Sequence, residues 1–184
     1  PIEEATFIDY AKWEGRSDFL DLFLYAQAEM AIAGSASGID QIAFTFNIPA
    51  VTTNFIPFED PRMAISKAMV IPCLLRSTVT GETVPLSTMM QYRFGSSTRF
   101  QEAGLEPVYN TAEEIIEVVH EAVDRLLPEG SGSNSESKLE IQFWNWAEQQ
   151  GISERVTAGP WTTDFCRARI GTAFLRRHSR ILLA

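Results

Sequence analysis

The chain has few residues for disulfide or metal-thiolate chemistry. It contains two cysteines, Cys73 and Cys166, and two histidines, His120 and His178. The cysteines are far apart and form no CxxC motif, so the pattern favours a reducing compartment over a disulfide framework. Neither histidine belongs to a convincing set of Cys, His or carboxylate residues at ligand spacing. We therefore predict neither a zinc site nor a Ser-His-Asp triad.

Long apolar runs are also missing. No stretch reaches the ~18–20 residues that a membrane span needs. The acidic N-terminus, Pro1–Glu4, lacks the apolar region of a signal peptide. The chain begins at Pro1 rather than at Met, which suggests a piece of a longer protein. We predict a cytoplasmic location and leave peripheral attachment to a membrane open.

Positive charge is scarce, and the net charge is −9. This balance disfavours nonspecific binding to nucleic acid, which is not expected as a partner. The last 18 residues differ, because 167–184 holds five arginines and no acid. Two interpretations stay open for this basic tail. It is either a solvated helix face that complements an acidic body, or a helix that docks on a separate acidic surface or on anionic lipid.

What the chain does have is a regular alternation of strand and helix patterns over its first third. Residues 6–10, 30–34 and 50–53 are typical of strands, and residues 18–28 and 38–46 of helices. The order β-α-β-α-β with short connections predicts an α/β fold with a doubly wound parallel sheet, as in Rossmann-like domains.

The rest of the chain shows mainly helix patterns, with two further expected strands. Thr111 and Glu114 form a capping-box pattern at the start of a long helix. We expect residues 1–130 to form a Rossmann-like domain, and residues 131–184 to form a mobile loop and a helical extension that packs on it or on a preceding half. The remaining expected elements are a strand at 68–71, a helix at 86–92, an irregular stretch at 94–105, an edge strand at 108–109, and helices at 111–127, 136–149 and from 163 or 164 to 183.

A loop of small residues joins the second expected strand to the helix after it. Its candidate ligand-binding residues are Gly34, Ser35, Ser37, Gly38 and Ile39. Free N–H groups at a helix start and close approach to glycine favour a phosphate there. The loop has neither the Gly-Lys-Ser/Thr of a Walker A motif nor the G-x-G-x-x-G spacing. The alternative is that the small residues only permit tight packing of strand on helix.

Other polar residues are expected near the same crevice. Asp9 and Asn54 end the first and third expected strands, and Asp40 and Gln41 open the helix after the loop as candidates for ribose contact. The alternative for Asp9 and Asn54 is local turn chemistry. No metal ligand is assigned, because Asp18 and Asp21 fit the first turn of a helix better than a metal site.

The chain contains a series of short motifs: Phe7–Tyr10, Ser17–Leu24, Gly34–Ile39, Phe46–Pro49, Ile71–Pro72, Leu86–Ser87, Asn110–Ile115, Ser137–Trp144 and Arg169–Leu175. In this order they resemble the motifs of a largely uncharacterised family of bacterial glycosyltransferases linked to surface polysaccharide assembly. Cys73 departs from the family pattern, which has lysine after Ile-Pro, and Ala36 stands where a more polar residue is usual.

The resemblance implies a GT-B-like enzyme with two Rossmann-like halves, of which this chain is the C-terminal, donor-binding half. The implied partners are a nucleotide-sugar, a carbohydrate or lipid-linked acceptor, and the N-terminal half of the same enzyme. No cofactor and no metal are implied, no catalytic residue is assigned, and the isolated chain is expected to be inactive. The alternative is a non-enzymatic α/β module that binds a partner through its basic C-terminal helix and the Trp-rich helix at 136–149.

Overall fold

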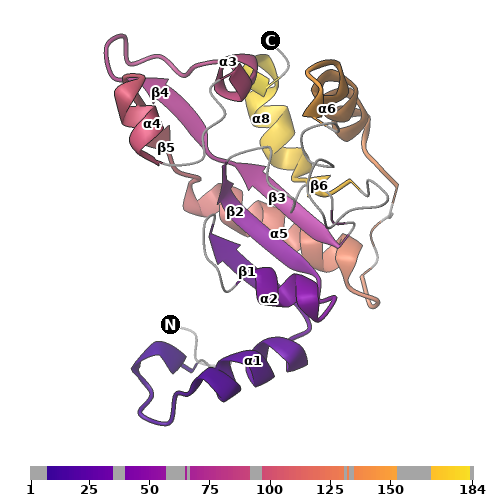
Figure 1. The fold of residues 1–184 in the computed structure, drawn as a ribbon. Coiled ribbons are helices and arrows are strands. Elements are labelled where there is room, and N and C mark those ends of the chain that lie inside the picture. Colours follow the sequence, from indigo (N-terminus) through magenta and orange to yellow (C-terminus); the bar gives the residue numbers. More distant parts are fainter. Residues whose placement is uncertain are drawn as a thin grey trace.

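The N-terminal segment forms an arm that lies beside the rest of the molecule (Figure 1). The computed structural model describes residues 8–34, 40–56, 65, 67–91, 97–130, 132, 135–152 and 167–182. The arm contains a short 3₁₀ helix, η1 (Tyr10–Lys12), and α1 (Asp18–Gln27). Ser17 caps α1 by accepting a hydrogen bond from the Leu20 N–H. The start predicted for this helix is confirmed.

A four-stranded sheet forms the centre of the fold. Its strands are β1 (Ala31–Gly34), β2 (Ala50–Phe55), β3 (Ala68–Pro72) and β6 (Arg169–Ile170), in the order β1-β2-β3-β6. Every neighbouring pair is parallel. All five residues of β3 are buried, as expected for a parallel strand covered on both faces. The predicted α/β class with a parallel sheet is therefore confirmed.

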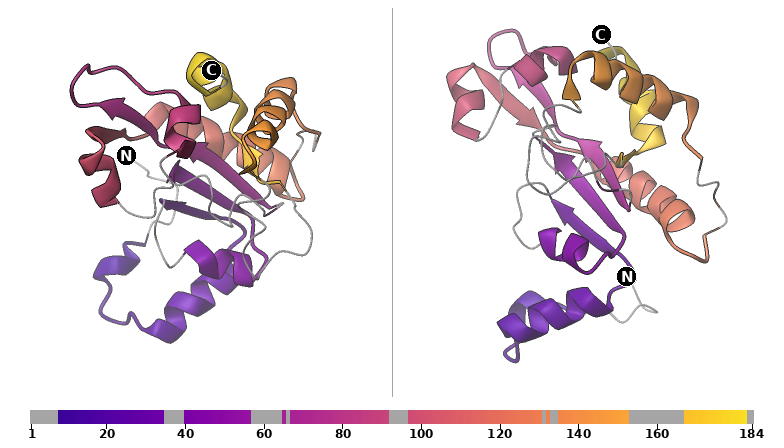
Figure 2. Two further views of the ribbon diagram at one scale, coloured as in Figure 1. Left: turned by 45° about the horizontal axis from the view of Figure 1, so that its top comes forward. Right: turned by 45° about the vertical axis from the view of Figure 1, so that its right-hand side comes forward.

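Helices cover this sheet on its two sides. The short helix α2 (Asp40–Thr45) connects β1 to β2, and α5 (Ala112–Leu126) packs against β2 and β3. Figure 2 shows the sheet between α2 and α5. Two further helices, α6 (Lys138–Gln149) and α8 (Thr172–Leu182), pack on each other, and α8 also packs on α5. The helices α5, α6 and α8 are called the C-terminal layer below.

A second, smaller sheet leaves the first at the end of β3. Its antiparallel strands are β4 (Leu74–Ser77) and β5 (Leu105–Val108), and the chain between them carries α3 (Leu86–Gln91) and α4 (Ser97–Glu102). The prediction included α3 and an edge strand near 108, but it contained neither β4 nor α4. Both elements are short, and their sequences lack a clear period.

Two predicted elements differ from the structure. Residues 8–10 form no strand, because the chain there enters η1, and residues 1–7 lie outside the described part. Residues 163 and 164, where the last helix was predicted to begin, lie outside the described part, and the described helix α8 begins at Thr172, after β6. A two-residue strand has no readable alternation, so this step was not visible in the sequence.

The segment after residue 130 shares the core of the sheet. One buried cluster joins Val51 and Ile71 of the sheet to Phe143, Trp144 and Leu175 of the C-terminal layer. Residues of α6 and α8 thus pack on the sheet, and residues 169–170 add β6 to it. Among the described residues, we find no helix with the length and apolar character to cross a membrane.

Candidate functional site

The carboxyl ends of β1, β2 and β3 meet at one edge of the sheet, beside a cavity of about 430 Å³. Gly34, Asn54 and Cys73 line it from the sheet side. The structure therefore brings together two of the predicted site residues, Gly34 and Asn54. The volume of this cavity is in the range of small-molecule sites. The other described residues that line this carboxyl-edge cavity are Ile56, Phe100, Gln101, Leu105, Glu106, Pro107 and Tyr109.

Asn54 is held by a reciprocal pair of hydrogen bonds. Its backbone N–H donates to Asn110 Oδ1 over 2.5 Å, and the Asn110 N–H donates to Asn54 Oδ1 over 2.6 Å. Asn110 Nδ2 also donates to the Pro72 carbonyl over 2.8 Å. Asn54 has a positive φ of 52°, which asparagine tolerates better than most residues. None of these hydrogen bonds uses Asn54 Nδ2.

Gly34 faces open space. A Cβ atom added there would meet no described heavy atom within 4 Å, and the residue has no positive φ that would demand glycine. Packing within the described residues therefore does not explain why this position is glycine. The backbone at the end of β1 is therefore open to close approach by another group.

Cys73 is 1% exposed, and burial raises the pKa of its thiol to about 11. Such a thiol stays protonated and is a poor nucleophile. The one charged residue among the described lining residues, Glu106, pairs with Arg76 at 2.6 Å. Tyr109 is 68% exposed and offers an aromatic face. This lining suits a neutral, ring-shaped group with hydrogen-bonding edges.

The other predicted site residues lie elsewhere or outside the description. Asp9 does not end a strand. It precedes η1 in the arm, where its carboxylate pairs with Lys12 Nζ at 2.9 Å. Its assignment to the strand-end crevice is therefore wrong. Asp40 and Gln41 form the start of α2, and their side chains lie outside the described part. The same holds for the whole of Ser35, Ser37, Gly38 and Ile39.

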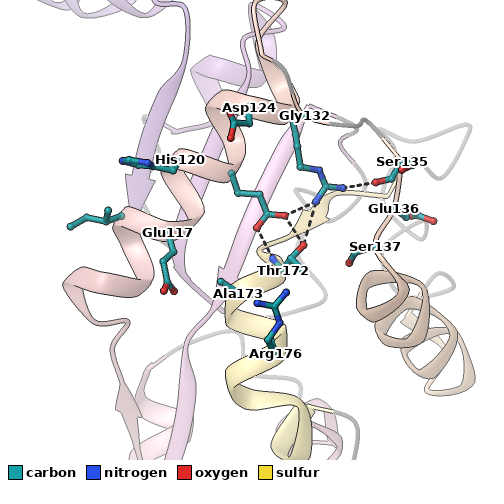
Figure 3. Close-up of a pocket in the computed structure, with 13 residues that line it drawn as sticks. Glu117, His120, Asp124, Gly132, Ser135, Glu136, Ser137, Thr172, Ala173 and Arg176 are labelled. Atoms are coloured by element: carbon teal, nitrogen blue, oxygen red, sulfur yellow. Dashed lines mark hydrogen bonds and ion pairs between the residues drawn. The ribbon is translucent and has the colours of Figure 1, made fainter.

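A larger cavity of about 700 Å³ lies between α5, α8 and the segment before α6 (Figure 3). Dashed lines in Figure 3 follow a polar network across it. The Glu121 carboxylate accepts hydrogen bonds from the Thr172 N–H and hydroxyl, at 2.7 and 2.6 Å, and from Arg125 Nη1 at 2.5 Å. Arg125 Nη2 donates to Glu140 Oε2 at 2.9 Å and to the Ser135 carbonyl at 3.0 Å.

This α5–α8 network is structural. The Glu121 carboxylate occupies the N-terminus of α8, the place where an external anion would otherwise bind. Glu140 and Arg125 have side chains that are 1% and 9% exposed, so their ion pair is sequestered from water. The network joins α5, α6 and α8 through their own charges. We therefore place the candidate site at the smaller carboxyl-edge cavity.

The basic tail and the Trp-rich helix both pack inward. Trp144 and Phe143 of α6 are fully buried. In α8, Arg177 pairs with Glu117 at 3.0 Å, and His178 Nε2 lies 2.6 Å from Glu114 Oε1. These residues bind the chain's own acidic helix α5. This arrangement agrees with the interpretation of the tail as a face that complements an acidic body.

The described part of the chain contains no group of three or more His, Cys, Asp or Glu side chains that could hold a metal ion. Asp18 and Asp21 lie in the first turn of α1, as expected from the helix dipole.

Comparison of the chain with protein-family models, with curated proteins and with solved structures gave no match. The glycosyltransferase resemblance therefore depends on the order of sequence motifs alone.

Proposed function

We propose that the chain is the donor-binding portion of a glycosyltransferase. It would help to move a sugar from a nucleotide-sugar to an acceptor hydroxyl in surface polysaccharide or glycoconjugate assembly. The observation that carries the proposal is the cavity at the carboxyl edge of the parallel sheet, with Gly34 and Asn54 on its wall. Open α/β sheets bind their ligands outside this edge. The ordered motifs that resemble the glycosyltransferase family supply the ligand class.

The lining of the cavity favours the neutral part of the donor. A diphosphate would need cationic or N–H donors, and none of the described lining residues is a Lys or an Arg. A nucleobase or a sugar ring instead matches the exposed face of Tyr109 and the amides of Asn54 and Gln101. The base or sugar would lie against these residues, while the diphosphate would lie toward the chain that follows Gly34.

The reaction sets the demands on the site. The bond between the anomeric carbon and the diphosphate oxygen breaks, and the acceptor oxygen forms the new bond to that carbon. The acceptor proton passes to a base, and the nucleoside diphosphate leaves with the bonding electrons. The proposed donors for the developing charge are the N–H groups at Ser37, Gly38 and Ile39 and the hydroxyls of Ser35 and Ser37. The general base that takes the acceptor proton, and the acceptor itself, would be held by the preceding half of the enzyme.

Titration with a panel of nucleoside diphosphates and nucleotide-sugars, followed by amide NMR or calorimetry, tests the proposal. At least one ligand is expected to shift the amides of Gly34 and Asn54. Gly34→Val should weaken binding without loss of thermal stability, because its new side chain fills open space. Tyr109→Ala should also weaken binding. Phe19→Ala serves as a matched control, because Phe19 is a similarly exposed aromatic in the arm. If no nucleotide moves these amides, the proposal is wrong.

A further inference from the structure

Strand β2 contains a bulge at the end that borders the carboxyl-edge cavity. Thr52 pairs with Val70 of β3, and the next paired residue on β2 is Phe55, opposite Pro72. Between these pairs, two residues of β2 stand opposite one residue of β3. The second of the two is Asn54, with its positive φ of 52°. Bulges are rare between parallel strands, and they are common beside functional sites, where they re-aim a side chain.

The side-chain amide of Asn110 bridges the two strands at this bulge. Its Oδ1 accepts a hydrogen bond from the Asn54 N–H on β2, and its Nδ2 donates to the Pro72 carbonyl on β3. A side-chain amide carries the same acceptor and donor groups as a peptide unit, so it can serve both strands at once. The bulge is therefore held by a residue that lies far along the chain from β2.

The groups that Asn110 binds belong to the cavity wall or adjoin it. Asn54 lines the cavity, and Pro72 precedes the lining residue Cys73. Tyr109, which follows β5 and precedes Asn110, lines the wall on the side of the second sheet. Asn110 itself is not among the described lining residues. Its place in the fold suits a residue that orients other side chains rather than one that touches a ligand.

A second bond makes the contact reciprocal and fixes the Asn54 side chain as well. The Asn110 N–H donates to Asn54 Oδ1 over 2.6 Å. We call these two residues the asparagine clamp. A left-handed backbone at a residue other than glycine persists only where the surroundings fix it, and such residues gather at functional sites. Among the described residues, Asn47 is the one other non-glycine residue with a positive φ, and it precedes the opposite end of β2.

We propose that Asn110 is a positioning residue of the carboxyl-edge cavity. Its amide binds the ends of β2 and β3, while its chain neighbour Tyr109 belongs to the other wall. The clamp therefore sets the separation of the two walls and gives the cavity its shape before a ligand arrives. A preformed site spares the ligand the cost of ordering it. The class of ligand, a nucleotide-sugar, rests on the proposed function, whereas the placing of the walls does not.

Amide NMR of the ligand-free 184-residue chain tests the placing of the walls. Asn110→Ala should shift the signals of Gly34 and Gln101, which lie on the two walls. Asn54→Gly should shift the same signals, because glycine keeps the positive φ but loses the side chain that the clamp holds. It carries the test alone if Asn110→Ala does not fold. Asn47→Gly is the matched control and should leave both signals in place. If the folded clamp variants also leave them in place, the proposal is wrong.

Titration with the diphosphates of uridine, guanosine, adenosine, cytidine and thymidine tests the link to binding. Asn110→Ala and Asn54→Gly should each raise the dissociation constant roughly tenfold, the effect of about one lost buried hydrogen bond. The double variant should raise it by less than the product of the two, because both changes break one clamp. Asn47→Gly should leave it unchanged.

Unchanged affinity in Asn110→Ala, measured where the variant is folded, would overturn the positioning role, and so would a double variant that equals the product. If no diphosphate binds the original chain, the proposed function fails. The amide shifts of the ligand-free variants then still decide whether the clamp places the walls.

Discussion

The N-terminal arm and the C-terminal layer contain similar kinds of helix but use them differently. In the C-terminal layer, α6 buries Phe143 and Trp144, and α8 buries Phe174 and Leu175. In the arm, α1 has no buried residue although its mean hydrophobic character is higher. The difference lies in the elements that cover each helix, because the helices of the layer pack on one another, while α1 packs on the short helix α2. Stability should therefore reside in the layer.

The largest expected effect comes from cutting the ion network of the layer. Arg125→Met leaves the buried Glu140 without its cationic partner and removes one donor to Glu121. Removal of one partner of a buried pair costs about 3–5 kcal/mol. Unfolding in guanidinium at neutral pH measures the loss.

The matched change in the arm is Lys12→Met. Lys12 pairs with Asp9, but its side chain is 85% exposed. Exposed pairs contribute little, so no measurable change in the free energy of unfolding is expected. Equal effects of Lys12→Met and Arg125→Met would contradict the assignment of stability to the layer.

Helix caps give a second, smaller comparison. Thr111 caps α5 with Glu114 in a complete capping box, and Ser17 caps α1 with a single bond. Thr111→Ala should lower the free energy of unfolding by about 1 kcal/mol. Ser17→Ala should leave global unfolding unchanged, because α1 has no buried residue. It should instead speed the hydrogen exchange of the α1 amides. A global loss from Ser17→Ala as large as that from Thr111→Ala would show that the arm is coupled to the core.

Local signals account for the part of the fold that the sequence predicted. The Thr111–Glu114 capping box is present, and the strands predicted at 30–34, 50–53 and 68–71 correspond to β1, β2 and β3. Ser137 and Glu140 form a second capping box that the same Ser-x-x-Glu spacing could have revealed. These features depend on residues within a few positions of each other.

Long-range pairing accounts for what was missed. The second wall of the carboxyl-edge cavity comes from α4 and β5, whose residues meet Gly34 and Asn54 only through the antiparallel pairing of β4 with β5. β6 is a strand because Ile170 pairs in parallel register with Val70 of β3, which lies a hundred positions earlier in the chain. Asp9 was misplaced because the segment Thr6–Tyr10, with three apolar residues among its five, was interpreted as a strand. No signal within the sequences of β4, β5 or β6 specifies the strand with which each one pairs.

The smallest effect is a pH dependence confined to the layer. Burial raises the pKa of Glu114, but hydrogen bonds from His178 and from the Thr111 N–H outweigh burial and hold the pKa below its ordinary value. The stabilisation from Glu114 is therefore fully present above the ordinary glutamate pKa. It is lost as the pH falls through the lowered pKa of the folded state, because the unfolded chain then binds the proton more readily. Denaturant unfolding at a series of acidic pH values measures this limb.

Glu114→Gln removes the titrating carboxylate and should flatten the acid limb of the stability curve while it lowers stability near neutral pH. His178→Phe should have a related but smaller effect, because it removes one of the bonds that lower the pKa of Glu114 and leaves the Thr111 N–H in place. In the Glu114→Gln background, His178→Phe should then change the slope of the acid limb little, since the carboxylate through which it acts is gone. An acid limb that keeps its slope in Glu114→Gln would mean that other carboxylates set the pH response of the layer.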